Sequence, residues 1–183
     1  MKSSSIRFCA TGLLLALAGT TFAATKTFTN GGGDGLWSNA ANWSDGSLPK
    51  TADDVIIPAG ASAVTVDGTF SVNSITISGG RALAVNGSLT TTASITGGSI
   101  SLNLPGTLLV GADLSGASFS FNGGQVGAGL NTRNTNITIN STEPTSIGVR
   151  GTATVSGDLA DGQTLSLTAE NPLPTNVTWN GSP

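Results

Sequence analysis

Three short segments, Ile100-Ser101-Leu102, Phe119-Ser120-Phe121 and Ile137-Thr138-Ile139, decide the fold that this sequence predicts. In each segment two apolar residues flank one small polar residue, which is the alternation of a β-strand with one buried side. The first two segments begin 19 residues apart and the last two 18 residues apart. A near-constant period of this length, with two or three short strands inside it, indicates stacked coils.

The same pattern continues on both sides of these three segments. Further triplets are Val55-Ile56-Ile57, Val64-Thr65-Val66, Ile75-Thr76-Ile77, Leu83-Ala84-Val85, Ile147-Gly148-Val149 and Leu165-Ser166-Leu167. Glycine-rich pairs between triplets, such as Gly79-Gly80, Asn86-Gly87 and Gly97-Gly98, predict corners with positive φ. We therefore expect an all-β solenoid of about six coils. A β-sandwich also explains short strands with frequent turns, but the long period and the glycine corners favour the solenoid.

The first 23 residues have the pattern of a secretory signal peptide. Lys2 and Arg7 supply the positive charge, residues 13–18 form the apolar run, and Thr21 and Ala23 occupy the −3 and −1 positions of a small-residue cleavage site. The apolar run is shorter than the roughly 20 residues that a membrane-spanning helix needs. We expect cleavage after Ala23, no membrane span afterwards, and a secreted or cell-surface protein of bacterial type.

Composition then limits the chemistry of the mature chain. It would keep five basic and ten acidic residues, a net charge of −5, which argues against nucleic acid as a partner. The chain has no histidine, and its one cysteine, Cys9, lies in the predicted signal. A serine or cysteine nucleophile with a histidine base is therefore excluded, and zinc, copper and haem lose their usual ligands. We expect no catalytic residues, no cofactor and no metal.

Residues 24–54 differ from the repeat and contain two of the three tryptophans, Trp37 and Trp43. An end coil exposes unpaired strand edges and needs a cap. We therefore divide the chain into a signal peptide (1–23), an N-terminal cap containing these tryptophans (24–54) and β-helix repeats (55–183). As an alternative, the two rings could form an exposed platform that contacts glycans; burial in the cap is favoured because Trp43 lies beside turn residues.

The start of the mature chain resembles a known family of proteins. The matching residues are Gly35-Leu36-Trp37, Asn42-Trp43, Gly46, Leu48-Pro49, Asp53-Asp54-Val55-Ile56-Ile57-Pro58 and Val64-Thr65-Val66. They resemble the opening of secreted bacterial right-handed parallel β-helix proteins, including pectin-lyase-like and autotransporter-like surface proteins. The resemblance implies a single-stranded right-handed parallel β-helix at the cell surface; many members are adhesins or matrix components, and some relatives act on polysaccharides.

Three further groups of residues are candidate sites. Asp45, Asp53 and Asp54 offer hard oxygen ligands to calcium, although local hydrogen bonding at the entry to the first strand is favoured. A second group, spaced by about one coil, could bind a uronic-acid chain, although scattered solvated charges are favoured: Asp113, Arg133 and Arg150. A third group could form an ice- or polymer-binding array, although ordinary β-surface composition is favoured: Thr65, Thr76, Thr138, Thr154 and Thr178.

The function that these observations favour is structural or adhesive and non-enzymatic. A polysaccharide-binding or polysaccharide-cleaving, lyase-like module is the alternative. Extracellular polysaccharide or other surface proteins are the expected partners.

Overall fold

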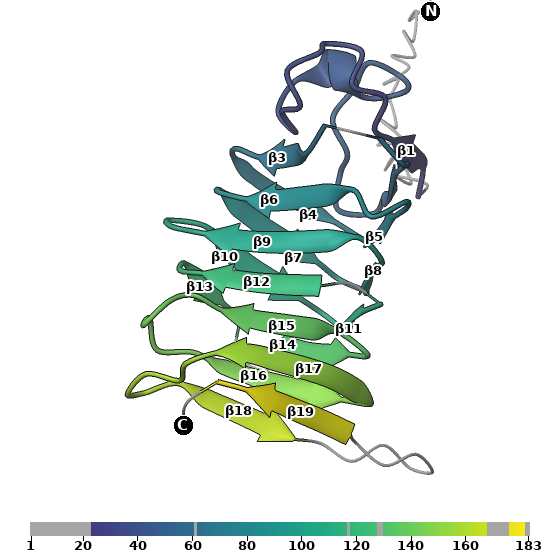
Figure 1. Cartoon of the computed structure of the whole chain (residues 1–183). Coiled ribbons are helices and arrows are strands. Elements are labelled where there is room, and N and C mark those ends of the chain that lie inside the picture. Colours follow the sequence, from purple (N-terminus) through teal and green to yellow (C-terminus); the bar gives the residue numbers. More distant parts are fainter. Residues whose placement is uncertain (1–22, 61, 117, 128–129, 168–175, 182–183) are drawn as a thin grey trace, which may run out of the picture.

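The computed structural model of the protein describes residues 23–60, 62–116, 118–127, 130–167 and 176–181. In this part of the chain, parallel strands stack into a β-solenoid of about six turns, with the N-terminal head at one end (Figure 1). The predicted β-solenoid fold is thus confirmed. Residues 1–22, nearly all of the predicted signal peptide, lie outside the described residues.

Three parallel sheets, called here the first, second and third, form the sides of the solenoid. The first sheet contains β1 (Thr25–Thr27), β2 (Asp54–Ile57), β5 (Ser74–Ile77), β8 (Ile95–Thr96), β11 (Asp113–Ser115), β14 (Leu130–Arg133), β16 (Ser146–Arg150) and β18 (Thr164–Leu167). The third sheet contains β3 (Val64–Val66), β6 (Ala82–Val85), β9 (Ser99–Asn103), β12 (Ser118–Asn122), β15 (Asn136–Ile139), β17 (Thr152–Gly157) and β19 (Asn176–Asn180). The shorter second sheet contains β4 (Thr69–Val72), β7 (Ser88–Thr91), β10 (Thr107–Val110) and β13 (Gln125–Val126).

The chain visits the sheets in a fixed order. From β2 to β13 it passes from the first sheet to the third and then to the second, so that each turn adds one strand to each side. After β13 the described strands alternate between the first and third sheets only. The solenoid therefore has three sheet-forming sides over its first turns and two over its last.

The strand register follows the sequence period. Val55 pairs with Ile75 across β2 and β5, and Ile100, Phe119 and Ile137 form one continuous row across β9, β12 and β15. Equivalent apolar residues of successive turns therefore lie directly above one another. In such rows a parallel ladder satisfies the backbone hydrogen bonds while like side chains pack together.

The inward direction of the apolar positions is also confirmed. Phe119, Phe121 and Ile137 are completely buried, while Ile139 exposes only 4% of its surface. The polar residue between two buried ones, such as Ser120, lies on the outer face. Burial of one large aliphatic or aromatic side chain stabilises a fold by about 1.5–3 kcal/mol, so the repeated inward rows account for a large share of the stability.

Glycine has two different roles at the corners. Gly97 and Gly98 have φ of 78° and 69°, as the sequence predicts, and a Cβ on Gly97 would lie 2.2 Å from the carbonyl oxygen of Ile77. The prediction for Asn86-Gly87 is wrong, because neither residue has a positive φ. Gly87 is instead required by close packing, since a Cβ there would lie 2.2 Å from the carbonyl oxygen of Gly68.

The head begins with a strand that belongs to the solenoid. β1 pairs in parallel with β2, Lys26 lying opposite Val55, and so adds one row to the first sheet before the repeats begin. The rest of the head is irregular apart from a short 3-10 helix, η1 (Ala40–Asn42). Asn39 caps this helix by accepting a hydrogen bond from the backbone N–H of Ala41 at 3.0 Å.

Candidate functional site

The two head tryptophans are buried in an aromatic cluster. Trp37 exposes 0% and Trp43 2% of its surface, and their ring centroids lie 4.8 Å apart at an interplanar angle of 68°. Phe28 meets Trp43 edge-on at 5.2 Å, and the indole N–H of Trp43 donates to the carbonyl oxygen of Trp37 at 2.9 Å. Neither ring presents a face to solvent, so a glycan-contact platform at Trp37 and Trp43 does not fit the structure.

The residues around these rings occupy the strand edges at this end of the solenoid. The backbone N–H of Trp37 donates to the carbonyl oxygen of Thr65 at 2.8 Å, and that of Thr65 donates to Gly35 at 2.9 Å. The head thus pairs with β3 in the third sheet, while β1 pairs with β2 in the first. The edges of β2 and β3 that face this end thus have backbone partners, and this protects them from edge-to-edge association.

The three aspartates considered as calcium ligands are engaged separately. Lys26 donates to Asp45, and this hydrogen bond is the main cause that lowers the pKa of Asp45 to about 2. Hydrogen bonds donated by Ser74 and by Asn73 lower the pKa of Asp54.

The two oxygens of Asp53 accept the backbone N–H groups of Ala24 and Lys50, at 3.1 and 2.8 Å. Within the described residues no group of three or more acidic, histidine or cysteine side chains could hold a metal ion. The interpretation favoured from sequence, local backbone hydrogen bonding, holds for Asp45 and Asp53, which accept from the backbone N–H groups of Ser47 and Lys50. It is wrong for Asp54, whose partners are side chains of the next turn.

The structure brings the second candidate group together on the outer face of the first sheet. Arg133 and Arg150 lie opposite each other on β14 and β16, and an Arg150 nitrogen (Nη1) lies 3.6 Å from Asp113 Oδ1. The two side chains of this ion pair are partly exposed, at 36% and 24%. Because one guanidinium is already paired with a carboxylate, the group is of mixed sign and offers an anionic polymer less than two free arginines would.

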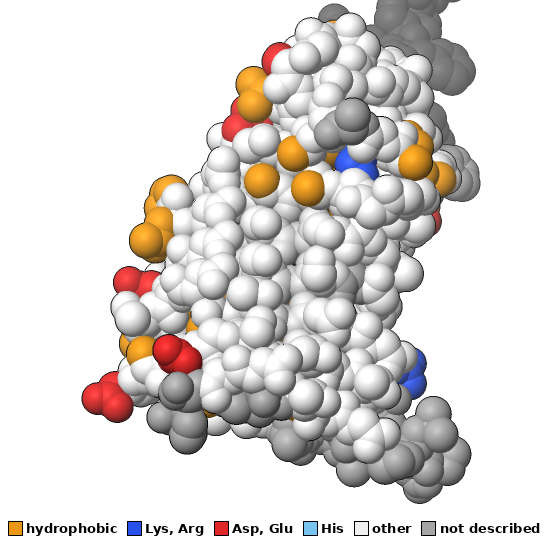
Figure 2. All heavy atoms as spheres, in the orientation of Figure 1, with side chains coloured by type: hydrophobic (Ala, Val, Ile, Leu, Met, Phe, Trp, Pro, Cys, Tyr) orange, Lys and Arg blue, Asp and Glu red, His pale blue; other side chains and the backbone are white. Residues whose placement is uncertain are grey.

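The outer face of the third sheet is a regular polar surface. One row crosses all seven strands in register: Thr65, Ala84, Ser101, Ser120, Thr138, Ser156 and Asn180. In the strands of this sheet, as the structure bounds them, no residue is Asp, Glu, Lys or Arg. Figure 2 shows the resulting pale surface over β9, β12 and β15, with neither acidic nor basic side chains at its centre.

This face differs from the threonine array considered from sequence. Thr65 and Thr138 belong to the same row, and Thr154 pairs with Thr178 on the same sheet, but Thr76 lies on β5 in the first sheet. The row mixes hydroxyl, amide and methyl groups, so it has no regular threonine spacing. Its common properties are small size and absence of charge.

An asparagine ladder borders this face, and sequence reasoning did not single it out. The side-chain amides of successive turns donate to one another at 2.8–2.9 Å in the order Asn140, Asn122, Asn103 and Asn86. The available signal was the recurrence of Asn at intervals of 17–19 residues directly after the triplets. Each amide satisfies its neighbour, which fixes the edge of the face.

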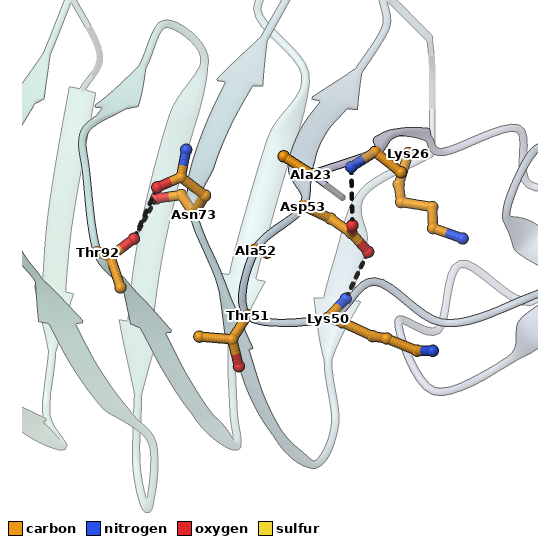
Figure 3. Close-up of a pocket in the computed structure, with 9 residues that line it drawn as sticks. Ala23, Lys26, Lys50, Thr51, Ala52, Asp53, Asn73 and Thr92 are labelled. Carbon is orange, nitrogen blue, oxygen red and sulfur yellow. Dashed lines mark hydrogen bonds between the residues drawn. The ribbon is translucent and has the colours of Figure 1, made fainter. Parts of the chain in front are cut away.

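An open pocket of about 880 Å³ lies beside the entry to the first sheet. It is lined by Ala23, Ala24, Lys26, Lys50, Thr51, Ala52, Asp53, Asn73 and Thr92. Figure 3 shows the Asp53 carboxylate accepting two hydrogen bonds at this place, while the side chain of Lys50 extends away from it. The pocket combines one buried carboxylate with two lysines.

Comparison of the chain with models of protein families, with curated proteins and with solved structures finds no match. Among the described residues there is no helix with the length and apolar character that crossing a membrane requires.

Proposed function

We propose that this protein is exported and works without catalysis, as a structural or adhesive element that binds neutral extracellular polysaccharide through the outer face of its third sheet. The observation that carries the proposal is the uncharged row of small polar residues across all seven strands of that sheet. Hydroxyl and amide groups donate and accept hydrogen bonds, as sugar hydroxyls do.

The charge of the chain supports a neutral partner. The mature chain would carry a net charge of −5, which repels anionic polymers at long range. An uncharged polymer is not repelled in this way. The third-sheet face has no charged residue in its described strands that would have to be desolvated on contact. The secretory pattern of residues 1–23 supports export to where such polymers occur.

Binding and cleavage are separated by one pair of assays on the mature protein. In the binding assay, we expect retention on an array of neutral polysaccharides and weaker retention on uronic-acid polymers. In the lyase assay, carried out with added calcium and monitored by ultraviolet absorbance, we expect no release of unsaturated products. Product release would replace the adhesive proposal with the lyase-like alternative. Absence of retention on every glycan would contradict the proposed partner.

A further inference from the structure

Among the residues that the structure describes, the carboxylate of Asp53 has no ion-pair partner. The residue exposes only 4% of its surface. Its Oδ1 accepts from the backbone nitrogen of Ala24 at 3.1 Å, and its Oδ2 accepts from the backbone nitrogen of Lys50 at 2.8 Å. Both donors are neutral amides in the uncleaved chain. A buried carboxylate is costly unless a positive charge lies beside it.

The charged groups on the neighbouring elements have other roles. On β1, Lys26 donates to the side chains of Asp45 and Ser47. The side chain of Lys50 extends away from Asp53 (Figure 3). On β2, Asp54 accepts from the side chains of Asn73 and Ser74 and adds a second negative charge nearby. Within the described part of the chain, no ion pair involves Asp53.

We infer that Asp53 is the binding site for the α-ammonium group that signal cleavage creates at Ala24. A signal peptidase would add one water across the Ala23–Ala24 peptide bond, leaving a carboxylate on Ala23 and an amine on Ala24 that takes up a proton at neutral pH. The nitrogen concerned is the atom that already lies 3.1 Å from Asp53 Oδ1. Cleavage thus converts a neutral hydrogen bond into a partly buried ion pair at an existing position.

The sheet fixes this nitrogen in place. The carbonyl oxygen of Ala24 accepts from the backbone N–H of Asp54 at 2.9 Å, and β1 begins at the next residue. A chain that begins one residue earlier or later would carry its positive charge away from Asp53. The site therefore selects one mature N-terminus, and correct processing stabilises the edge of the first sheet. The inference rests on the proposed export and on cleavage after Ala23.

The test compares three forms of the mature protein: one beginning at Ala24 with a free amine, the same chain acetylated at that amine, and one beginning at Ala23. Each is made with Asp53 and with Asp53→Asn. We expect acetylation or the extra residue to lower Tm at pH 7 by about 3 °C or more when Asp53 is present. In the Asp53→Asn protein the three forms should differ by less than about 1 °C, because no charge pair remains to be lost.

Titration followed by NMR gives a direct readout of the pair. We expect Asp53 to raise the pKa of the Ala24 amine above the ordinary value of about 8. A matched control, Asp45→Asn, removes another head carboxylate and should leave both the raised pKa and the effect of acetylation in place. An amine that titrates at its ordinary value, together with an unchanged Tm after acetylation, would overturn the inference.

Two further measurements keep the test decisive. If the Asp53→Asn protein does not fold, the three N-terminal forms and the titration still test the pair in the protein with Asp53. N-terminal sequencing of exported material tests the premise separately: a start other than Ala24 would contradict the processing step. The proteins made to begin at Ala24 test the ion pair without depending on export.

Discussion

The head and the repeated body of this protein are stabilised in different ways. In the body, each turn contributes similar strands, and apolar residues such as Ile100, Phe119 and Ile137 form in-register rows. The head has little regular structure, and its shape depends on individual side chains. Asp34, for example, accepts from the backbone N–H of Leu36 and from the side chain of Asn42, which is completely buried. The stability of the body is therefore distributed over many equivalent residues, whereas the structure of the head depends on individual residues.

The two regions meet at a buried arginine. Arg81 exposes only 6% of its surface and donates to the carbonyl oxygens of Ser62 and Pro58, at 2.7 and 3.2 Å. Its guanidinium lies 5.1 Å from the centroid of the Phe28 ring, at cation–π distance. A residue at a corner of the body therefore holds an aromatic residue of the head.

The largest effect is expected from removing the aromatic centre of the head. In the double variant Trp37→Ala, Trp43→Ala, each substitution should cost about 3–5 kcal/mol, because both rings are buried. Loss of the head would also free the edges of β2 and β3, so the protein should associate and bind hydrophobic dyes. Size-exclusion chromatography measures this, with Ala41→Ser, at an exposed position, as the control. A monomeric double variant of normal stability would contradict the proposed capping role.

A single core substitution in the body should be similarly costly per residue but should leave the protein monomeric. Phe119→Ala should lower the free energy of unfolding by about 3–5 kcal/mol, because the ring is completely buried. Ser120→Ala, on the outer side of the same strand, should change it by less than about 0.5 kcal/mol. Denaturant unfolding of both variants measures the difference. Equal effects would show that the inward and outward faces of β12 are assigned incorrectly.

The smallest stability effect concerns the charge pair of the head. The pKa of Asp45 is lowered from its ordinary value of 3.8 to about 2, mainly by the hydrogen bond from Lys26. A lowered folded-state pKa stabilises the fold above the ordinary value, and this contribution is lost as the pH falls through about 2. The difference in unfolding free energy between wild type and Asp45→Asn should therefore shrink as the pH falls from about 3.8 to about 2. A difference independent of pH, measured by urea unfolding, would contradict the pairing.

The body was predictable because its physical signal is repeated. Alternation defines the buried side of each strand, and the spacing of Val55 and Ile75 gives the register directly. The last turns were less predictable, because after β13 the second sheet contributes no further strand among the described residues. Loss of one side does not interrupt the triplets of the other two sheets, so the sequence period changes little.

The candidate sites were less predictable than the fold. Burial of Trp37 and Trp43 followed from their position before the first coil, but the hydrogen bonds of Asp34 and Asn42 depend on an irregular backbone that no periodicity describes. The uncharged face was visible only as single small residues in separate triplets. It becomes a surface once the register places Ser101 beside Ser120 and Thr138.

The proposed binding surface lies on the body, and one measurement tests this proposal most directly. In the variant Ser101→Lys, Ser120→Lys, two charges stand at the centre of the third-sheet face, where desolvating them opposes contact with a neutral polymer. Thr76→Lys, Thr96→Lys is the matched control, because Thr76 and Thr96 are exposed and pair on neighbouring strands of the first sheet. The proposal predicts that retention on neutral polysaccharide falls at least about tenfold, or about 1.4 kcal/mol, in the third-sheet variant and is unchanged in the control. Equal retention of the two variants would contradict it.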